Sequence, residues 1–277
     1  MKIGLIGKGY WGNIIYNNLI VLGYQNILTY DVSINNGVTI NDMLQCDYIF
    51  ICTPLETHFE LCKFFLKNDK NVFCEKPLTS NLEQCNELYS LAKNKNLFVD
   101  WIFTYNESVN FIKKLVSEKR YGELKSISMN RLNYGPIRTD TDARYDLASH
   151  DLSILYYILN TFPDKLFWLN YKRNQNSVQN DSVIGLFKIK DIFAQINCSW
   201  SYRMKDRTCI FEFENGFVEW NDSNKILKLN NNENIFDEES TPLKNSIKDF
   251  LSKKFDFDYQ KNLTVNIIKM LLYENTF

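Results

Sequence analysis

The sequence predicts an α/β chain: an N-terminal doubly wound parallel sheet followed by a C-terminal α+β domain with a mostly antiparallel sheet. Two observations predict this fold class. Strand-like and helix-like stretches alternate over about the first hundred residues, as they do in parallel sheets covered by helices. After about residue 120, strand-like runs follow one another without helices between them, which favours antiparallel neighbours. We therefore expect one domain over residues 1–120 and a second over residues 121–277.

Composition narrows the class of protein. Hydrophobic residues make up 45% of the 277 residues and charged residues 23%, with a net charge of −1, which is ordinary for a soluble globular chain without nucleic-acid or membrane partners. No stretch is long and apolar enough to span a bilayer, and the chain begins directly with a strand, which predicts a cytoplasmic protein. Seven cysteines without a C-x-x-C motif and only two histidines predict free thiols in a reducing compartment and no metal site.

The first element is a buried strand over residues 2–6 that runs directly into a glycine-rich turn. The turn is followed by a helical pattern that stops at Gly23, so strand, G-x-G-x-x-G and helix form the dinucleotide-binding fingerprint of a Rossmann domain. Gly7 permits the tight turn, Gly9 lets the pyrophosphate approach the backbone, and Gly12 lets the helix pack closely on the strand. The residues of the turn expected to bind the cofactor are Gly7, Lys8, Gly9, Tyr10, Trp11 and Gly12.

The second strand, over residues 26–30, predicts which dinucleotide binds. Asp31 ends this strand nineteen residues beyond Gly12, where a carboxylate accepts hydrogen bonds from the adenosine ribose and repels a 2′-phosphate. The following residues 32–36 contain no Arg or Lys to hold such a phosphate. This pattern favours NAD(H) over NADP(H). The alternative is an ordinary strand, turn and helix with a surface aspartate.

Three further strands are expected over residues 47–52, 71–74 and 97–101. Ligands of parallel sheets bind beyond the carboxyl ends of the strands. That rule places the remaining expected cofactor contacts on one rim: Thr53, Pro54, His58, Glu75 and Lys76. His58 opens the helix after the third strand, where it contacts the cofactor or, alternatively, lies on the surface near the helix N-terminus.

Lys76 is the first candidate catalytic residue. It stands between Glu75 and Pro77 at the end of a predicted strand, and Pro77 biases Lys76 towards extended geometry. Its ammonium group would then reach the cleft, where it can hydrogen-bond a substrate oxygen. The alternative is a surface Glu–Lys pair.

Asp146 and His150 form the second candidate group. They stand four residues apart at the start of a helix expected from Leu147 to Leu159, so they share a helix face. A histidine oriented by a carboxylate is the usual general base. Alternatively, Asp146 is the helix N-cap, His150 a satisfied polar residue and Asp151 a helix-start charge.

The second half of the chain is rich in strand-like runs, with Asn215-Gly216 as a hairpin signal between two of them. Strands are expected over residues 124–132, 166–171, 182–189, 193–200, 208–213 and 217–220, and closing helices over about 243–252 and 259–274. An open sheet with an apolar face predicts a homodimer or homotetramer.

Taken together, these motifs resemble the Gfo/Idh/MocA family (glucose-fructose oxidoreductase and inositol dehydrogenase). The resemblance rests on the Gly7–Gly12 turn, on Cys52-Thr53-Pro54 with His58, on Glu75-Lys76-Pro77-Leu78, and on Asp146 with His150. It implies a Rossmann domain followed by a domain with a large open sheet. It also implies a sugar, polyol or nucleotide-sugar substrate oxidised at a secondary alcohol by NAD(P). Lys76, Asp146 and His150 would be the catalytic group.

Three segments resemble family members of nucleotide-sugar and surface-polysaccharide pathways more closely. They are residues 101–106, 133–138 and 145–151, in which Trp101 replaces a histidine and Ser149 a proline. This resemblance implies substrate-binding roles for Tyr105, Arg138, Tyr145 and His150. The leading hypothesis is an NAD-dependent sugar or nucleotide-sugar dehydrogenase. The alternatives are a non-catalytic NAD- or sugar-binding regulator or scaffold, and an enzyme that reduces an imine or a tetrapyrrole.

Overall fold

The computed structural model describes residues 1–34, 36–93, 96–230, 232–235 and 241–275, and these form two compact units. The first unit comprises residues 1–102 and 240–268, and the second comprises residues 103–239 and 269–277. The contacts therefore group residues 103–120 with the second unit and the closing helices with the first, whereas the sequence placed one boundary at residue 120. No helix in the described part of the chain is long and apolar enough to cross a membrane.

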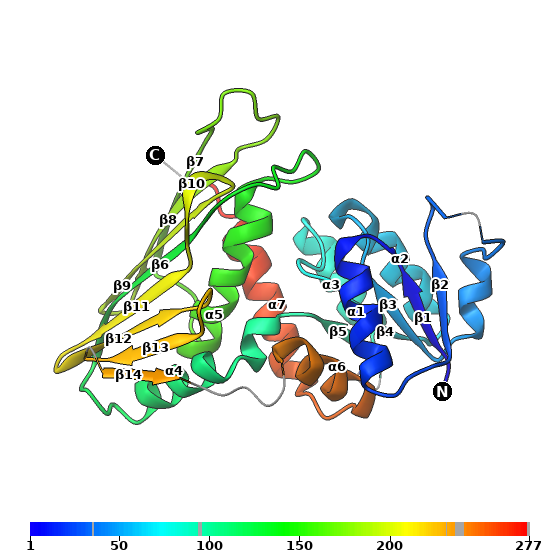
Figure 1. Ribbon diagram of the computed structural model, residues 1–277, viewed down its shortest axis with the longest axis horizontal. Helices are drawn as coiled ribbons and strands as arrows, with labels where there is room; N and C mark the ends of the chain where they lie inside the picture. The colour runs from blue at the N-terminus through cyan, green and yellow to red at the C-terminus, as the bar shows by residue number, and fades with distance from the viewer. Residues whose placement is uncertain (35, 94–95, 231, 236–240, 276–277) are drawn as a thin grey trace. The chain divides into compact units, whose positions relative to one another are not determined.

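A five-stranded parallel sheet forms the centre of the first unit, as predicted (Figure 1). Its strands are β1 (Ile3–Ile6), β2 (Ile27–Tyr30), β3 (Tyr48–Ile51), β4 (Asn71–Cys74) and β5 (Leu97–Val99). They lie in the order β2-β1-β3-β4-β5. The order reverses between β1 and β3, and a doubly wound sheet binds its ligand at this switch point.

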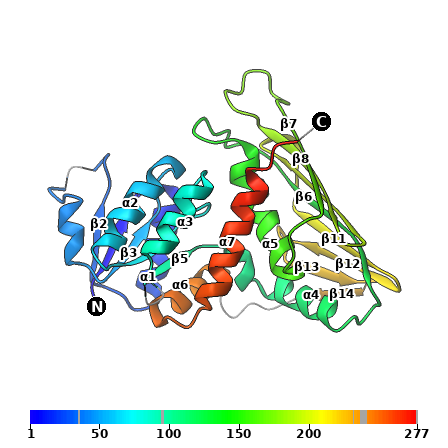
Figure 2. The ribbon, with the colours of Figure 1, turned by 180° about the vertical axis from the view of Figure 1, so that it is seen from behind.

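Helices cover both faces of this sheet. They are α1 (Tyr10–Val21), α2 (Leu55–Lys67), α3 (Leu82–Leu91), α6 (Pro242–Ser252) and α7 (Phe257–Leu271), with a 3₁₀ turn at Asn41–Gln45. Helix α1 lies in front of the sheet in Figure 1, and α2 and α3 lie in front of it in the opposite view of Figure 2. Phe250 of α6 packs edge-on against Phe50 and is also 5.5 Å from Phe73, centroid to centroid. The last part of the chain thus completes the core of the first sheet.

The second unit contains a nine-stranded sheet that is mostly antiparallel, as predicted. Its strands are β6 (Leu124–Tyr134), β7 (Lys165–Tyr171), β8 (Ser182–Ile189), β9 (Ile192–Ser199), β10 (Ser201–Asp206), β11 (Thr208–Phe213), β12 (Gly216–Asn221), β13 (Ile226–Leu229) and β14 (Asn232–Ile235). They lie in the order β14-β13-β12-β11-β6-β9-β8-β7, with β10 paired to β6. Strands β6 and β9 are parallel to each other.

Helices α4 (Glu107–Ser117) and α5 (Ser149–Leu159) belong to the same unit as this sheet, and α5 lies along one face of it (Figure 1). A 3₁₀ turn at Ile102–Tyr105 precedes α4, and a π-helical turn at Arg144–Ala148 leads into α5. The π turn packs on β8 and β9. The helix predicted from residue 147 to 159 is thus an α-helix preceded by a wider turn. Such π turns are frequent at functional sites.

Candidate active site

The first residue after each strand of the parallel sheet lies in one row at its carboxyl edge. Backbone hydrogen bonds join four neighbouring pairs: Gly7 N to Tyr30 O (2.9 Å), Cys52 N to Ile6 O (2.8 Å), Glu75 N to Ile51 O (3.0 Å) and Asp100 N to Cys74 O (2.9 Å). The strand registers continue by one residue beyond each strand. The row therefore reads Asp31, Gly7, Cys52, Glu75 and Asp100.

The glycines of the first turn each occupy a different environment. Gly7 has φ +88°, and a Cβ there would lie 2.6 Å from the carbonyl oxygen of Cys52. A Cβ on Gly12 would lie 1.9 Å from the carbonyl oxygen of Gly7. A Cβ on Gly9 would meet nothing within 4 Å. Gly7 and Gly12 are thus required by the local packing, and Gly9 faces the open space that a pyrophosphate needs to approach the backbone.

Helix α1 begins at Tyr10 without a side-chain cap, because Gly9 occupies the N-cap. Its first N–H groups therefore have no side-chain acceptor of this kind, as expected for an anion-binding helix terminus. The Asn13 amide instead donates to the carbonyls of Lys8 and Gly9 at 2.8 and 2.9 Å. The Lys8 ammonium lies 3.5 Å above the Tyr16 ring. Asn13 and Lys8 thus fix the turn in front of the helix.

Asp31 stands at the end of β2, next to this turn. Its carboxylate accepts hydrogen bonds from the Lys8 amide (2.6 Å) and from the amide and hydroxyl of Ser33 (2.8 and 2.6 Å). These bonds lower the pKa of Asp31, the Ser33 hydroxyl most, so the group is ionised at neutral pH. An ionised carboxylate has further lone pairs for ribose hydroxyls. Gly9, the α1 terminus and Asp31 therefore fit a dinucleotide.

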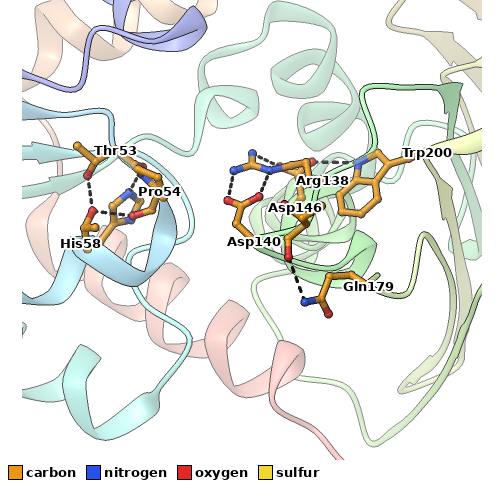
Figure 3. A network of polar contacts seen from close by, with 10 residues as sticks. Thr53, Pro54, His58, Arg138, Asp140, Asp146, Gln179 and Trp200 are labelled. Carbon is orange, nitrogen blue, oxygen red and sulfur yellow. Dashed lines mark hydrogen bonds and ion pairs between the residues drawn. The ribbon is translucent and has the colours of Figure 1, made fainter. Parts of the chain in front are cut away.

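His58 is a buried connection between two loops of the first unit, not a surface residue (Figure 3). Its Nδ1 lies 2.9 Å from the Pro77 carbonyl oxygen, and its Nε2 lies 2.9 Å from the Thr53 carbonyl oxygen. Burial lowers the pKa of His58, although both carbonyls oppose this effect. Thr53, whose hydroxyl accepts from Thr57 at 2.6 Å, is thereby tied to the loop that carries Lys76. His58 and Thr53 thus connect two rim segments, and Pro54 occupies the N-cap of α2.

Glu75 and Lys76 follow β4. Glu75 is buried and accepts a hydrogen bond from the Trp11 indole of α1. Lys76 is half-buried, and its positive charge acts to lower the pKa of Glu75 and of Asp100. The pair therefore lies within a buried cluster, which excludes the alternative of an exposed surface pair for Glu75.

Asp146 and His150 lie in the second unit, and the π turn changes their local setting. Asp146 accepts from the Trp200 indole at 3.1 Å and from Arg138 at 3.5 Å (Figure 3). The capping role proposed as an alternative for Asp146 belongs to Asp142, whose carboxylate accepts from the Tyr145 amide at 3.0 Å. The His150 ring packs edge-on against Phe103, with centroids 5.4 Å apart.

The expected substrate residues also lie in the second unit. Arg138 forms a two-bond contact with Asp140, at 2.6 and 3.1 Å, besides its contact with Asp146. Tyr145 is half-buried, and burial raises its pKa. Tyr105 is half-buried at the end of the turn before α4. The structure thus groups Arg138, Asp146 and Trp200, whereas Lys76 and the cofactor residues belong to the other unit.

Sequence reasoning missed three buried charged residues, Asp151, Arg131 and Asp100. Asp151, expected as a helix-start charge, is fully buried and pairs with Arg131 of β6 through bonds of 2.6 and 3.0 Å. The available signal was the place of Arg131 in the predicted strand, two and four residues after Met129 and Ile127 and hence on the same face as these apolar side chains. Asp100 is also fully buried, and its signal was its place as an acidic residue inside the predicted strand over residues 97–101. Within the described residues, no cluster of three or more histidine, cysteine or acidic side chains could hold a metal ion.

Comparison with known proteins agrees with this architecture. Residues 27–102 match the family described as "Oxidoreductase family, NAD-binding Rossmann fold" (GFO_IDH_MocA). Over 125 residues the chain is 26% identical to inositol 2-dehydrogenase from Rhizobium meliloti, covering 42% of this chain and 38% of that protein. The chain spans between 26% and 57% of the first curated relatives that it matches.

Solved structures resemble the fold over nearly the whole chain. UDP-N-acetylglucosamine 3-dehydrogenase GnnA from Acidithiobacillus ferrooxidans has a TM-score of 0.81 at 16% identity, covering 98% of this chain and 96% of that one. The WlbA dehydrogenase from Bordetella pertussis, solved in complex with NADH and UDP-GlcNAcA, has a TM-score of 0.76 at 15% identity, covering 95% and 93%. These similarities confirm the fold class.

Proposed function

The chain carries, over residues 27–102, the NAD-binding Rossmann fold of the Gfo/Idh/MocA oxidoreductase family, and from this premise we propose its reaction. The protein transfers a hydride between the nicotinamide of NAD(H) and a secondary alcohol or ketone of a sugar or nucleotide-sugar, in surface-polysaccharide synthesis. The observation that carries the proposal is the carboxyl edge of the parallel sheet, where an ionised Asp31 follows β2, an open Gly9 lies in the turn after β1, and Lys76 follows Glu75 at the end of β4. The nucleotide-sugar enzymes among the structural neighbours support the substrate class.

Each residue has a separate task in this reaction. NAD⁺ supplies the hydride acceptor when it is bound. His150 takes the proton of the substrate hydroxyl, and Asp146, held by the Trp200 indole, stabilises the charged ring. Lys76 donates a hydrogen bond to the same oxygen and stabilises the negative charge that develops there. Tyr105, Arg138 and Tyr145 orient the sugar.

Replacing Lys76 tests the assignment most directly. We expect Lys76→Ala to lower kcat by roughly 100-fold or more, since general acid–base groups contribute about 10²–10⁴-fold, while the affinity for NADH changes little. NADH binding is followed by fluorescence, and turnover by NADH absorbance with a series of UDP- and dTDP-sugars. Lys67→Ala, at an exposed position of α2, is the control. A Lys76→Ala variant that keeps the turnover of the unsubstituted protein would contradict the assignment.

A protein that binds NADH and a sugar but turns over none would favour the regulator or scaffold.

We also propose a homodimer or homotetramer in the cytoplasm. Leu169 and Phe193 are 49% and 51% exposed on strands β7 and β9 of the large sheet, and a self-complementary contact would cover them. All seven cysteines are free, which supports a reducing compartment. Light scattering of the purified chain tests the oligomeric state.

A further inference from the structure

Glu75 and Asp100 lie side by side at the ends of neighbouring parallel strands. Cys74 of β4 pairs with Val99 of β5, and the Asp100 amide donates to the Cys74 carbonyl at 2.9 Å. The next residues on the two strands are therefore at the same level, on strands about 4.8 Å apart. The residue exposures are 9% for Glu75 and 0% for Asp100. Two carboxyl groups are thus buried next to each other.

The two carboxyl groups have few partners. Glu75 accepts from the Trp11 indole. Neither carboxylate oxygen of Asp100 has a hydrogen-bond partner among the described residues. The Ser246 hydroxyl of α6, which faces Asp100, donates to the Leu243 carbonyl at 3.0 Å.

The two carboxyl groups share one nearby positive charge. Lys76 is the cation that acts on both acids. Cys52, next in the row, has a pKa raised well above its usual value, first by burial and then by Glu75 and Asp100, so it stays a neutral thiol. One ammonium group balances one carboxylate, and a second buried anion beside the first is unfavourable. The pair therefore retains a proton.

The pair of carboxyl groups holds this proton at neutral pH, because the pKa values of both groups are raised. Burial, and then the charge of Asp100, raises the pKa of Glu75 well above its usual range. Burial raises the pKa of Asp100 to about 7, against the opposing effects of Ser246 and Lys76. The two groups titrate as a pair. A positive charge arriving nearby would favour loss of the proton, because it stabilises the carboxylate.

The cofactor of the proposed function would bring such a charge, and the inference rests on that function. A dinucleotide with its adenosine ribose at Asp31 crosses the switch point between β1 and β3. Its other half would then extend towards the ends of β4 and β5, where Glu75 and Asp100 lie. The nicotinamide ring is positively charged when oxidised and neutral when reduced.

We propose that Glu75 and Asp100 form a redox-linked proton site for the bound cofactor. The pair releases a proton to the solvent when NAD⁺ binds and retains it when NADH binds. When the bound NAD⁺ accepts a hydride, the pair takes a proton back from the solvent. Asp100 is thus a positioning residue that acts through charge and does not touch the reacting atoms.

Calorimetry of cofactor binding tests the proposal. The binding enthalpies of NAD⁺ and NADH are measured at pH 7 in three buffers of different ionisation enthalpy, which yields the number of protons released. A group with its pKa near the working pH is half protonated, so we expect NAD⁺ to release about 0.5 proton more than NADH. This difference disappears in Asp100→Asn and persists in Glu83→Gln, a control at an exposed position of α3.

Infrared difference spectroscopy of the unsubstituted protein provides a second measurement that needs no variant. The carbonyl stretch of a protonated carboxyl group should be weaker with NAD⁺ than with NADH. Equal proton release for both cofactors, or a difference that survives in Asp100→Asn, overturns the proposal while leaving the proposed function intact. If neither cofactor binds, the proposed function and this inference both fall.

Discussion

Asp31 is the residue from which we propose a preference for NAD(H). Three donors from Lys8 and Ser33 fix its carboxylate and keep it ionised. Because the folded-state pKa is lowered, the contribution of Asp31 to stability is present above its unfolded pKa of about 3.9 and is lost as pH falls through the lower folded value. The charge is therefore available for ribose hydroxyls throughout the neutral range.

Replacing Asp31 should change cofactor preference. We expect Asp31→Asn to weaken NADH binding by roughly 10-fold or more, because hydrogen bonds to charged groups are worth about 1.5–3 kcal/mol. The affinity for NADPH should fall less, since the repulsion between Asp31 and the 2′-phosphate of NADPH is removed. Fluorescence titration with both cofactors measures the ratio. Asp69→Asn, an exposed position outside the row, is the control, and an unchanged ratio in Asp31→Asn would refute the assignment.

The sequence could reveal residues whose role is local, and it missed those whose role depends on tertiary partners. Gly7 and Gly12 were predictable because a strand, a turn and a helix adjoin them in the chain. Asp100 and Arg131 were not, since their partners Glu75 and Asp151 lie elsewhere in the chain. His58 shows the same limit: its two carbonyl partners come from Thr53 and Pro77, on separate loops.

At the scale of elements, the π turn before α5 determines what Asp146 contacts. The spacing of Asp146 and His150 was interpreted with α-helical periodicity, but the turn at Arg144–Ala148 is wider. No periodicity signal predicts such a turn, because it depends on packing against β8 and β9. The strands were easier to predict. The hairpin signal at Asn215-Gly216 lies where β11 meets β12, because turn residues act locally.

The buried pair Arg131–Asp151 joins β6 to α5 and should be costly to break. We expect Arg131→Met to lower the free energy of unfolding by about 3–5 kcal/mol, because it leaves Asp151 buried without its cation. The double variant Arg131→Met/Asp151→Leu should recover most of this loss. Urea unfolding measures both.

An exposed ion pair provides the comparison. Lys114 in the last turn of α4 and Glu118 directly after this helix lie 3.7 Å apart, with most of the Lys114 side chain exposed, so Lys114→Met should cost less than about 1 kcal/mol. A double variant that is no more stable than Arg131→Met alone would contradict the expected role of the uncompensated carboxylate.

At the scale of the whole molecule, the chain leaves the first unit at residue 102 and returns to it at residue 240. Phe250 is fully buried after this return and packs against Tyr48, Phe50, Phe73 and Phe98. The alternation of strands and helices predicted the parallel sheet, but it contained no sign that a distant helix completes it. Long-range packing of this kind is not encoded in local periodicity.

Removing this ring should destabilise the first unit. We expect Phe250→Ala to cost about 3–5 kcal/mol, the usual cost of emptying a core phenylalanine site. Phe162→Ala, at a partly exposed position, should cost far less. Urea unfolding followed by circular dichroism compares the two, and equal costs would show that Phe250 does not hold the core together.

The return of the chain also has a consequence for synthesis. The parallel strands leave the ribosome first, but Phe250 emerges only after roughly 150 further residues, or about ten to thirty seconds at typical elongation rates. During that interval the aromatic face formed by Phe50, Phe73 and Phe98 lacks its cover. The nascent chain therefore exposes an aggregation-prone aromatic surface until its synthesis is complete. A chaperone that recognises aromatic side chains would bind this surface.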